Sequence, residues 1–119
     1  MKPLTKVDTF LKRFDNFKHG ELRSIEVISP TTMQVTLAGQ DTARAFDWIS
    51  MKLELSEVSD AKLLDSSKLS LVDMDSGISI VKTDDTLTFV IGEYDSPRGA
   101  KDSICFIVCS NIKYEEGLF

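Results

Sequence analysis

Alternating apolar and polar residues between Asp47 and Ser56 constrain the fold of this chain more than any other feature. Four apolar residues, Ile49, Met51, Leu53 and Leu55, fall on every second position there, with serine, lysine and glutamate between them. A period of two is typical of a strand that has one face against a core and the other in water. The same alternation returns in residues 33–37 and 87–91, so the sequence predicts a sheet with one buried face.

A helical pattern precedes these strands. Val7, Phe10, Leu11 and Phe14 follow the i, i+3, i+4, i+7 spacing that places side chains on one helix face. We therefore expect a helix over residues 6–15, with Thr5 and Asp8 forming a capping arrangement at its start. Its apolar stripe packs either on the sheet or against another subunit.

Further strands are expected on both sides of the central one. Residues 41–45 form one helical turn or a loop, 93–102 form a loop, and 57–70 have no clear pattern. The last strand is apolar on both faces, which predicts a central position covered from two sides. The additional strands are predicted at Glu21–Ser29, Thr32–Ala38, Leu69–Asp73, Ile78–Thr83, Thr86–Ile91 and Ser103–Ile112. Together these patterns predict one α+β domain over residues 1–119, with the N-terminal amphipathic helix packed on a mainly antiparallel sheet of about 6–7 strands.

Composition limits the classes of protein to which this chain can belong. The chain has 119 residues, 42% hydrophobic and 28% charged, which is ordinary for a globular domain. It has no run approaching the roughly 20 apolar residues that cross a bilayer, and no apolar signal core near Met1. We therefore expect a cytoplasmic protein without a membrane partner.

Two cysteines, Cys105 and Cys109, lie in the predicted last strand. Four residues along a strand separate them by about 13 Å, which is beyond disulfide reach. We expect two buried, reduced thiols. A zinc site is not expected, because the single histidine, His19, is distant in the sequence.

Charge is distributed unevenly along the chain. Residues 1–23 carry six Lys and Arg against three Asp and Glu, and the remainder carries eight against sixteen. An acidic body disfavours nucleic acid as a partner and favours a basic protein surface. The same acidity is also explained by solubility alone.

No local motif for catalysis or cofactor binding is present. The chain lacks a glycine-rich phosphate loop, a nucleophile elbow and a metal-spaced Cys/His set. Residues 73–77 resemble the start of a calcium loop, but an EF-hand that begins at Asp73 needs glycine where Ile78 stands. We therefore predict a turn there, and no catalytic residue, cofactor or metal ligand.

Two features have both a structural and a functional interpretation. His19 and Glu21 form either a weak acid–base pair or, more simply, a hydrogen-bonded turn between helix and strand. Trp48 lies on the face opposite Ile49, with Phe46 beside it. It belongs either to a second small apolar cluster or to an aromatic interface.

Residues 17–27 (FKHGELRSIEV) and 49–58 (ISMKLELSEV) resemble small β-rich bacterial immunity proteins of polymorphic-toxin systems. The first segment resembles the opening of those families, with an aromatic residue and a histidine close before an acidic residue and the first strand. The second is similar to their long strand that runs into an acidic, leucine-bearing segment, and the likeness covers residues 17–83. It implies a non-enzymatic protein that neutralises a toxin by binding it, and it carries over no catalytic residues.

The sequence thus predicts a non-enzymatic binding protein of a bacterium, with an immunity-like role as the most specific expectation. The alternatives are a structural homo-oligomer subunit, or a small-molecule binder or enzyme with a pocket between helix and sheet. A protein partner, basic or a second copy, is expected in the first two cases. The candidate protein-binding residues are Trp48, Glu54, Glu57, Asp60, His19 and Glu21.

Overall fold

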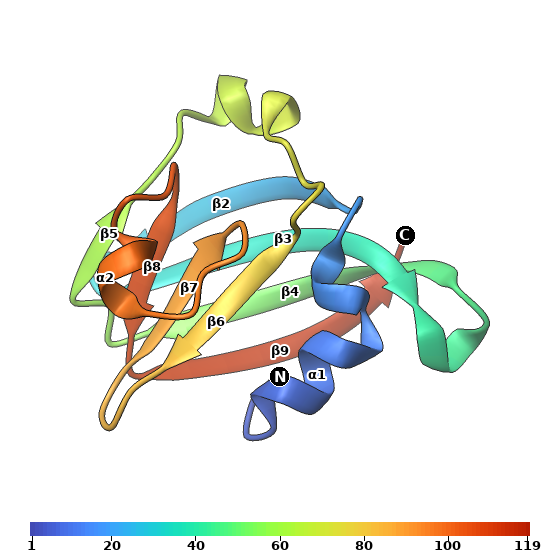
Figure 1. Cartoon of the computed structure of the whole chain (residues 1–119), viewed down its shortest axis with the longest axis horizontal. Helices are drawn as coiled ribbons and strands as arrows, with labels where there is room; N and C mark the ends of the chain where they lie inside the picture. The colour runs from blue at the N-terminus through green and yellow to red at the C-terminus, as the bar shows by residue number, and fades with distance from the viewer.

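The computed structural model describes all 119 residues, as two antiparallel sheets with a short helix at one end (Figure 1). The strand order is β1-β9-β4-β3-β2 in the five-stranded sheet and β5-β8-β7-β6 in the four-stranded sheet. The strands are β1 (Lys2–Pro3), β2 (Glu21–Ser29), β3 (Thr32–Asp41), β4 (Asp47–Ser56), β5 (Asp60–Lys62), β6 (Ile78–Lys82), β7 (Leu87–Ile91), β8 (Phe106–Cys109) and β9 (Asn111–Leu118). The helices are α1 (Val7–Arg13), α2 (Pro97–Ala100) and the 3-10 turns η1 (Asp15–Phe17), η2 (Thr42–Arg44) and η3 (Ser66–Leu71).

The predicted α+β character and the mainly antiparallel pairing are confirmed. The expected sheet of about 6–7 strands is not what the chain forms, because nine strands divide into two sheets. The division follows from burial: strands with one apolar face cover each other most completely when two sheets meet face to face.

The alternation in β4 has the predicted structural consequence. The four apolar residues at alternate positions of β4, from Ile49 to Leu55, face the other sheet and are almost fully buried. Lys52 and Glu54 lie on the outer face. β3 pairs with β4 over its whole length, with Met33 opposite Leu55 and Leu37 opposite Met51. The two inner faces meet in one cluster of 23 buried residues that includes side chains from both sheets.

The predicted last strand is two strands. β8 ends at Cys109, Ser110 lies between the strands, and β9 continues in the other sheet. Each strand keeps its own partners, since Phe89 pairs with Ile107 while Ile112 pairs with Leu55. The expectation that residues 103–112 run as one strand is therefore wrong, although β8 is central and buried as predicted.

Helix α1 buries the predicted stripe. Phe10, Leu11 and Phe14 are buried, and the ring of Phe14 stacks on Phe17 with 4.9 Å between centroids. Phe10 also contacts Tyr114 of β9, with 5.4 Å between centroids. The helix therefore packs on the chain's own core. Lys6 stands at the N-cap position and no side chain makes a capping hydrogen bond there, so the expected arrangement of Thr5 and Asp8 is not formed.

The segment between β5 and β6 arches past β2 (Figure 1). The short strand predicted at Leu69–Asp73 is wrong, because residues up to Leu71 belong to η3. Residues 73–77 form a turn, as expected, in which Asp75 N donates to Asp73 Oδ1 at 2.8 Å. Gly77 has a positive φ, and a Cβ there would lie 2.0 Å from the carbonyl oxygen of Asn16, so glycine is required.

Candidate interaction surface

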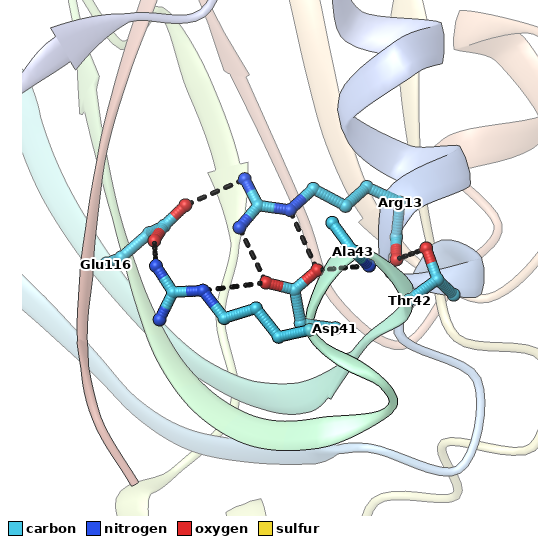
Figure 2. Close-up of polar contacts among 6 residues, drawn as sticks. Arg13, Asp41, Thr42, Ala43 and Glu116 are labelled. Atoms are coloured by element: carbon cyan, nitrogen blue, oxygen red, sulfur yellow. Dashed lines mark hydrogen bonds and ion pairs between the residues drawn. The ribbon is translucent and has the colours of Figure 1, made fainter.

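A cluster of four charged side chains joins α1, the β3–β4 connection and β9 (Figure 2). Arg13 donates from Nε to Asp41 Oδ1 at 2.9 Å and from Nη2 to Oδ2 at 2.6 Å, a two-pronged pair. Its Nη1 lies 2.7 Å from Glu116 Oε1. Arg44 lies between the same two acids, 2.8 Å from Glu116 Oε2 and 3.5 Å from Asp41 Oδ2. The cluster thus connects three elements that are far apart in the sequence.

Asp41 is the one fully buried charge, with no exposed surface. Hydrogen bonds from Arg13 hold the pKa of its carboxyl below the usual range; burial opposes this, and the backbone N–H of Ala43 assists it. The same contact raises the pKa of Arg13. Asp41 is therefore ionised at neutral pH and fully engaged, which identifies a structural clamp rather than an available acid or base.

The cluster fixes an unusual loop conformation. Ala45 and Phe46 both have a positive φ, of 54° and 66°, which is costly for residues other than glycine. Three contacts hold the turn: Asp41 accepts from Ala43 N, Asp41 O accepts from Phe46 N at 2.9 Å, and Gln40 Nε2 donates to Phe46 O at 3.3 Å. The result is a phenylalanine held in place with 61% of its surface exposed.

An aromatic patch lies on the outer face of the five-stranded sheet at the same end. The Trp48 and Phe119 rings meet at 5.4 Å between centroids, and the guanidinium of Arg23 lies 4.3 Å over the Phe119 ring. Arg23 is held in turn by Glu21, at 3.2 Å from Nε to Oε2. Trp48 is 37% exposed and Phe119 is 57% exposed. We call Glu21, Arg23, Phe46, Trp48 and Phe119 the aromatic patch.

A β-bulge brings Arg23 onto this face. The pairing of β2 with β3 shifts between Leu22 and Ser24, so Arg23 is an extra residue and no longer alternates with its neighbours. Its side chain joins that of Glu21 on the outer face. Alternation in the sequence does not signal such a bulge, so it does not predict Arg23 at this face. Phe119 comes beside Trp48 only through the long-range pairing of β9 with β4.

The structure divides the predicted binding residues into separate groups. Trp48 and Glu21 come together through Arg23 and Phe119. His19 does not pair with Glu21: its Nδ1 lies 3.2 Å from Asp75 Oδ1, in an exposed contact. His19 therefore contacts the 73–77 turn, and not Glu21 at the turn between helix and strand as the structural interpretation of this residue expects.

The predicted acidic residues lie away from the patch. Glu54 is six residues beyond Trp48 along β4, which is about 20 Å. Glu57 accepts a hydrogen bond from Asn111 at 3.3 Å, and Asp60 belongs to β5 of the other sheet. These three acids therefore lie toward the opposite end of β4 from Trp48.

Other chemistry is limited. No group of three or more His, Cys, Asp or Glu side chains is arranged to hold a metal ion. Cys105 and Cys109 are free and buried, as predicted, and desolvation raises their thiol pKa values to about 11 and about 12. No helix is both long and apolar enough to cross a membrane.

Comparisons with known proteins found no match: no family model, no curated protein and no solved structure matches this chain. The chain is a two-sheet, mainly antiparallel protein with an N-terminal helix and an exposed aromatic patch at one end of its larger sheet.

Proposed function

We propose that this chain is a non-enzymatic binding protein that engages a protein partner through the aromatic patch. The observation that carries the proposal is the exposed Trp48–Phe119–Arg23 cluster, with the exposed Phe46 two residues before Trp48 on a hydrogen-bonded loop. Tryptophan and arginine are enriched among residues that dominate binding energy, and exposed aromatic groups gather at interaction sites. A pre-formed loop also loses little conformational entropy on binding.

We further propose that the partner is a bacterial toxin, which would make the protein immunity-like. Support comes from the resemblance of residues 17–27 and 49–58 to immunity proteins, and Glu21, Arg23 and Trp48 lie in or beside those segments. The net charge of −5 supports a basic partner, because opposite charge speeds encounter.

The homo-oligomer alternative uses the same surface, since a second copy could cover the patch about a two-fold axis. A small-molecule site between helix and sheet has less support. One hollow beside α1, at Phe10 and Tyr114, is about 220 Å³, and another, at Leu11 and Ile80, is about 490 Å³. The second lies within the usual size of ligand pockets, roughly 300–1,000 Å³, but only three of its seven lining residues are apolar, whereas ligand pockets are mostly apolar.

The test compares two exposed apolar residues in the cell of origin. Trp48→Ala removes the centre of the patch, and Leu71→Ala removes a leucine that is more exposed but lies on η3. After affinity capture and mass spectrometry, we expect Trp48→Ala to lose a basic partner encoded beside this chain, and Leu71→Ala to keep it. Equal capture by both variants would contradict the proposal. Recovery of this chain alone, with a dimer mass that Trp48→Ala abolishes, would establish the homo-oligomer instead.

A further inference from the structure

Strand β2 leaves one edge of the larger sheet open. The strand order ends on β2, which pairs with β3 and with no other strand. Alternate backbone N–H and C=O groups of an edge strand point away from the sheet and can pair with another chain. The opposite end of this sheet is β1, which has two residues, whereas β2 has nine.

The inner face of β2 is only partly covered. Val27 pairs with Met33, so the two side chains share the inner face, yet Met33 is buried and Val27 is 58% exposed. Ile25, on the same face, is half-buried. The four-stranded sheet therefore does not reach the second half of β2, and an apolar strip remains open there.

A separate groove lies at the start of β2. It has a volume of about 450 Å³ and is lined by residues 20–23 and by the η3 segment, which arches past β2 in Figure 1. Leu22, Leu69, Val72 and Met74 supply its apolar wall. Ser66 and Ser70 of the η3 segment supply hydroxyl groups. The groove is large enough for an apolar side chain from an added strand.

Regular pairing of β2 is confined between two bulges. Register shifts occur between Leu22 and Ser24 and between Val27 and Ser29, so Ser24–Val27 is the regular stretch. Natural edges are often protected by lysine, but this stretch has none. Its one charged residue is Glu26, which pairs with Gln34 on the outer face and has no ion-pair partner.

We propose that β2 accepts an extended segment of a partner protein as an added strand. The segment alternates apolar residues, which cover Val27 and enter the groove, with basic residues, which face Glu26 and the acidic body of the chain. Main-chain hydrogen bonds supply affinity, and the alternate side chains supply specificity. The groove shares Glu21 and Arg23 with the aromatic patch, but strand addition on β2 uses none of Phe46, Trp48 and Phe119, and it stands whether or not those three residues bind a partner.

The probes are two synthetic octapeptides, one alternating valine with lysine and one alternating valine with glutamate. Each is titrated into the full chain labelled with ¹⁵N, and amide chemical shifts are followed. We expect the valine–lysine peptide to shift the signals of Ser24–Val27 and Leu69 and to slow amide exchange along β2. The valine–glutamate peptide should bind at least several-fold more weakly, because like charges oppose each other across strands.

Two variants with the same change in charge separate the effect of Glu26 at the β2 edge from the effect of the chain's net charge. Glu26→Lys should lower the affinity for the valine–lysine peptide by about fivefold, the size of a cross-strand charge effect. Glu93→Lys makes the same change at an exposed position beyond β7 and should shift affinity by less than about twofold. Trp48→Ala should leave peptide binding unchanged, which distinguishes failure here from failure of the aromatic patch.

Four results would overturn the proposal. They are no shift in β2 at millimolar peptide, equal binding of both peptides, equal effects of Glu26→Lys and Glu93→Lys, or shifts confined to the aromatic patch. A dimer that forms without peptide, with β2 of one copy paired to β2 of the other, would show that the β2 edge binds a second copy and not a partner segment.

Discussion

At the residue scale, the ion cluster around Asp41 matters most, because it fixes the loop that presents Phe46. A buried carboxylate is stable only when its charge is fully matched, and here Arg13, Arg44 and the Ala43 amide supply that match. The cluster therefore ties the exposed end of the sheet to α1.

We predict that Asp41→Asn lowers the free energy of unfolding by about 3 kcal/mol at pH 7, since it leaves two guanidinium groups without their buried partner. Glu116→Gln, at a half-exposed acid, should cost about 1 kcal/mol or less. Urea unfolding measures both. A similar small loss in both variants would show that Asp41 is not a clamp.

The same pair predicts a pH dependence. Arg13 lowers the folded-state pKa of Asp41 below its ordinary value of 3.8, so its contribution is fully present above that value and is lost as the pH falls through the lower, folded value. The stability difference between the unmodified chain and Asp41→Asn should therefore be constant from pH 7 to about pH 5 and shrink below about pH 4. A difference independent of pH down to pH 2 would contradict this assignment.

Thr88 provides a third residue-scale prediction. Its hydroxyl oxygen is buried and has no hydrogen-bond partner. Valine has the same shape without the polar group, so Thr88→Val should leave stability unchanged or raise it by up to about 1 kcal/mol. Thermal unfolding measures the change. A loss of more than about 1 kcal/mol would mean that the hydroxyl makes a bond that the structure does not show.

At the element scale, β7 and β8 show how one sheet buries both faces. Phe89 lies in the large core between the sheets, whereas Phe106 lies on the opposite face in a cluster of four buried residues with Val81, Val90 and Ala100. Ala100 belongs to α2, so this short helix covers the outer face of β8. The strand is thus central and apolar on both sides.

We predict that Phe89→Ala lowers the free energy of unfolding by about 3–5 kcal/mol, because a fully buried ring leaves a cavity in the main core. The loss in free energy of unfolding for Phe106→Ala should fall at the lower end of that range, because the smaller cluster under α2 can close over the gap. Chemical denaturation of both variants checks the order. A loss below about 1 kcal/mol at Phe89 would place it outside the core.

The thiols of the β8 region give an independent measure of its burial. Desolvation raises the pKa of Cys105 to about 11 and of Cys109 to about 12, so neither forms a reactive thiolate at neutral pH. We expect no labelling by a thiol reagent at pH 8 until denaturant unfolds the chain, when both react. Rapid labelling of the native protein would show that β8 is not covered.

At the scale of the whole molecule, we expect the acidic body to act on encounter with a partner rather than on the contact itself. Glu57 and Asp60 are exposed and lie toward the opposite end of β4 from the aromatic patch, so a partner bound at the patch would experience them only through the long-range field. Once a basic partner is identified, reversing both charges to lysine should slow association at low salt and leave dissociation unchanged. Stopped-flow rates at increasing salt test this, because screening shortens the Debye length from about 10 Å at 0.1 M to about 3 Å at 1 M. An association rate that depends on neither salt nor these charges would leave solubility as their role.

Local pattern was sufficient for much of this architecture. The bounds of β2 and β4, the stripe of α1 and the β6–β7 hairpin follow from spacing, because solvent-facing and core-facing positions repeat every two residues in a strand and about every 3.6 in a helix. The exposure of Trp48 on the outer face follows from the same alternation.

Tertiary structure decided the rest, since it depends on which segments meet. Residues 104–109 are apolar at every position, so their spacing does not reveal that the chain changes sheet at Ser110. Arg23 reaches Phe119 through a bulge, and the charge of Asp41 is matched by Arg13, which is 28 positions away and also pairs with Glu116 of β9. Periodicity along the chain determines which face of an element is buried, but the partner on the other side of that face is chosen by long-range packing and charge neutralisation.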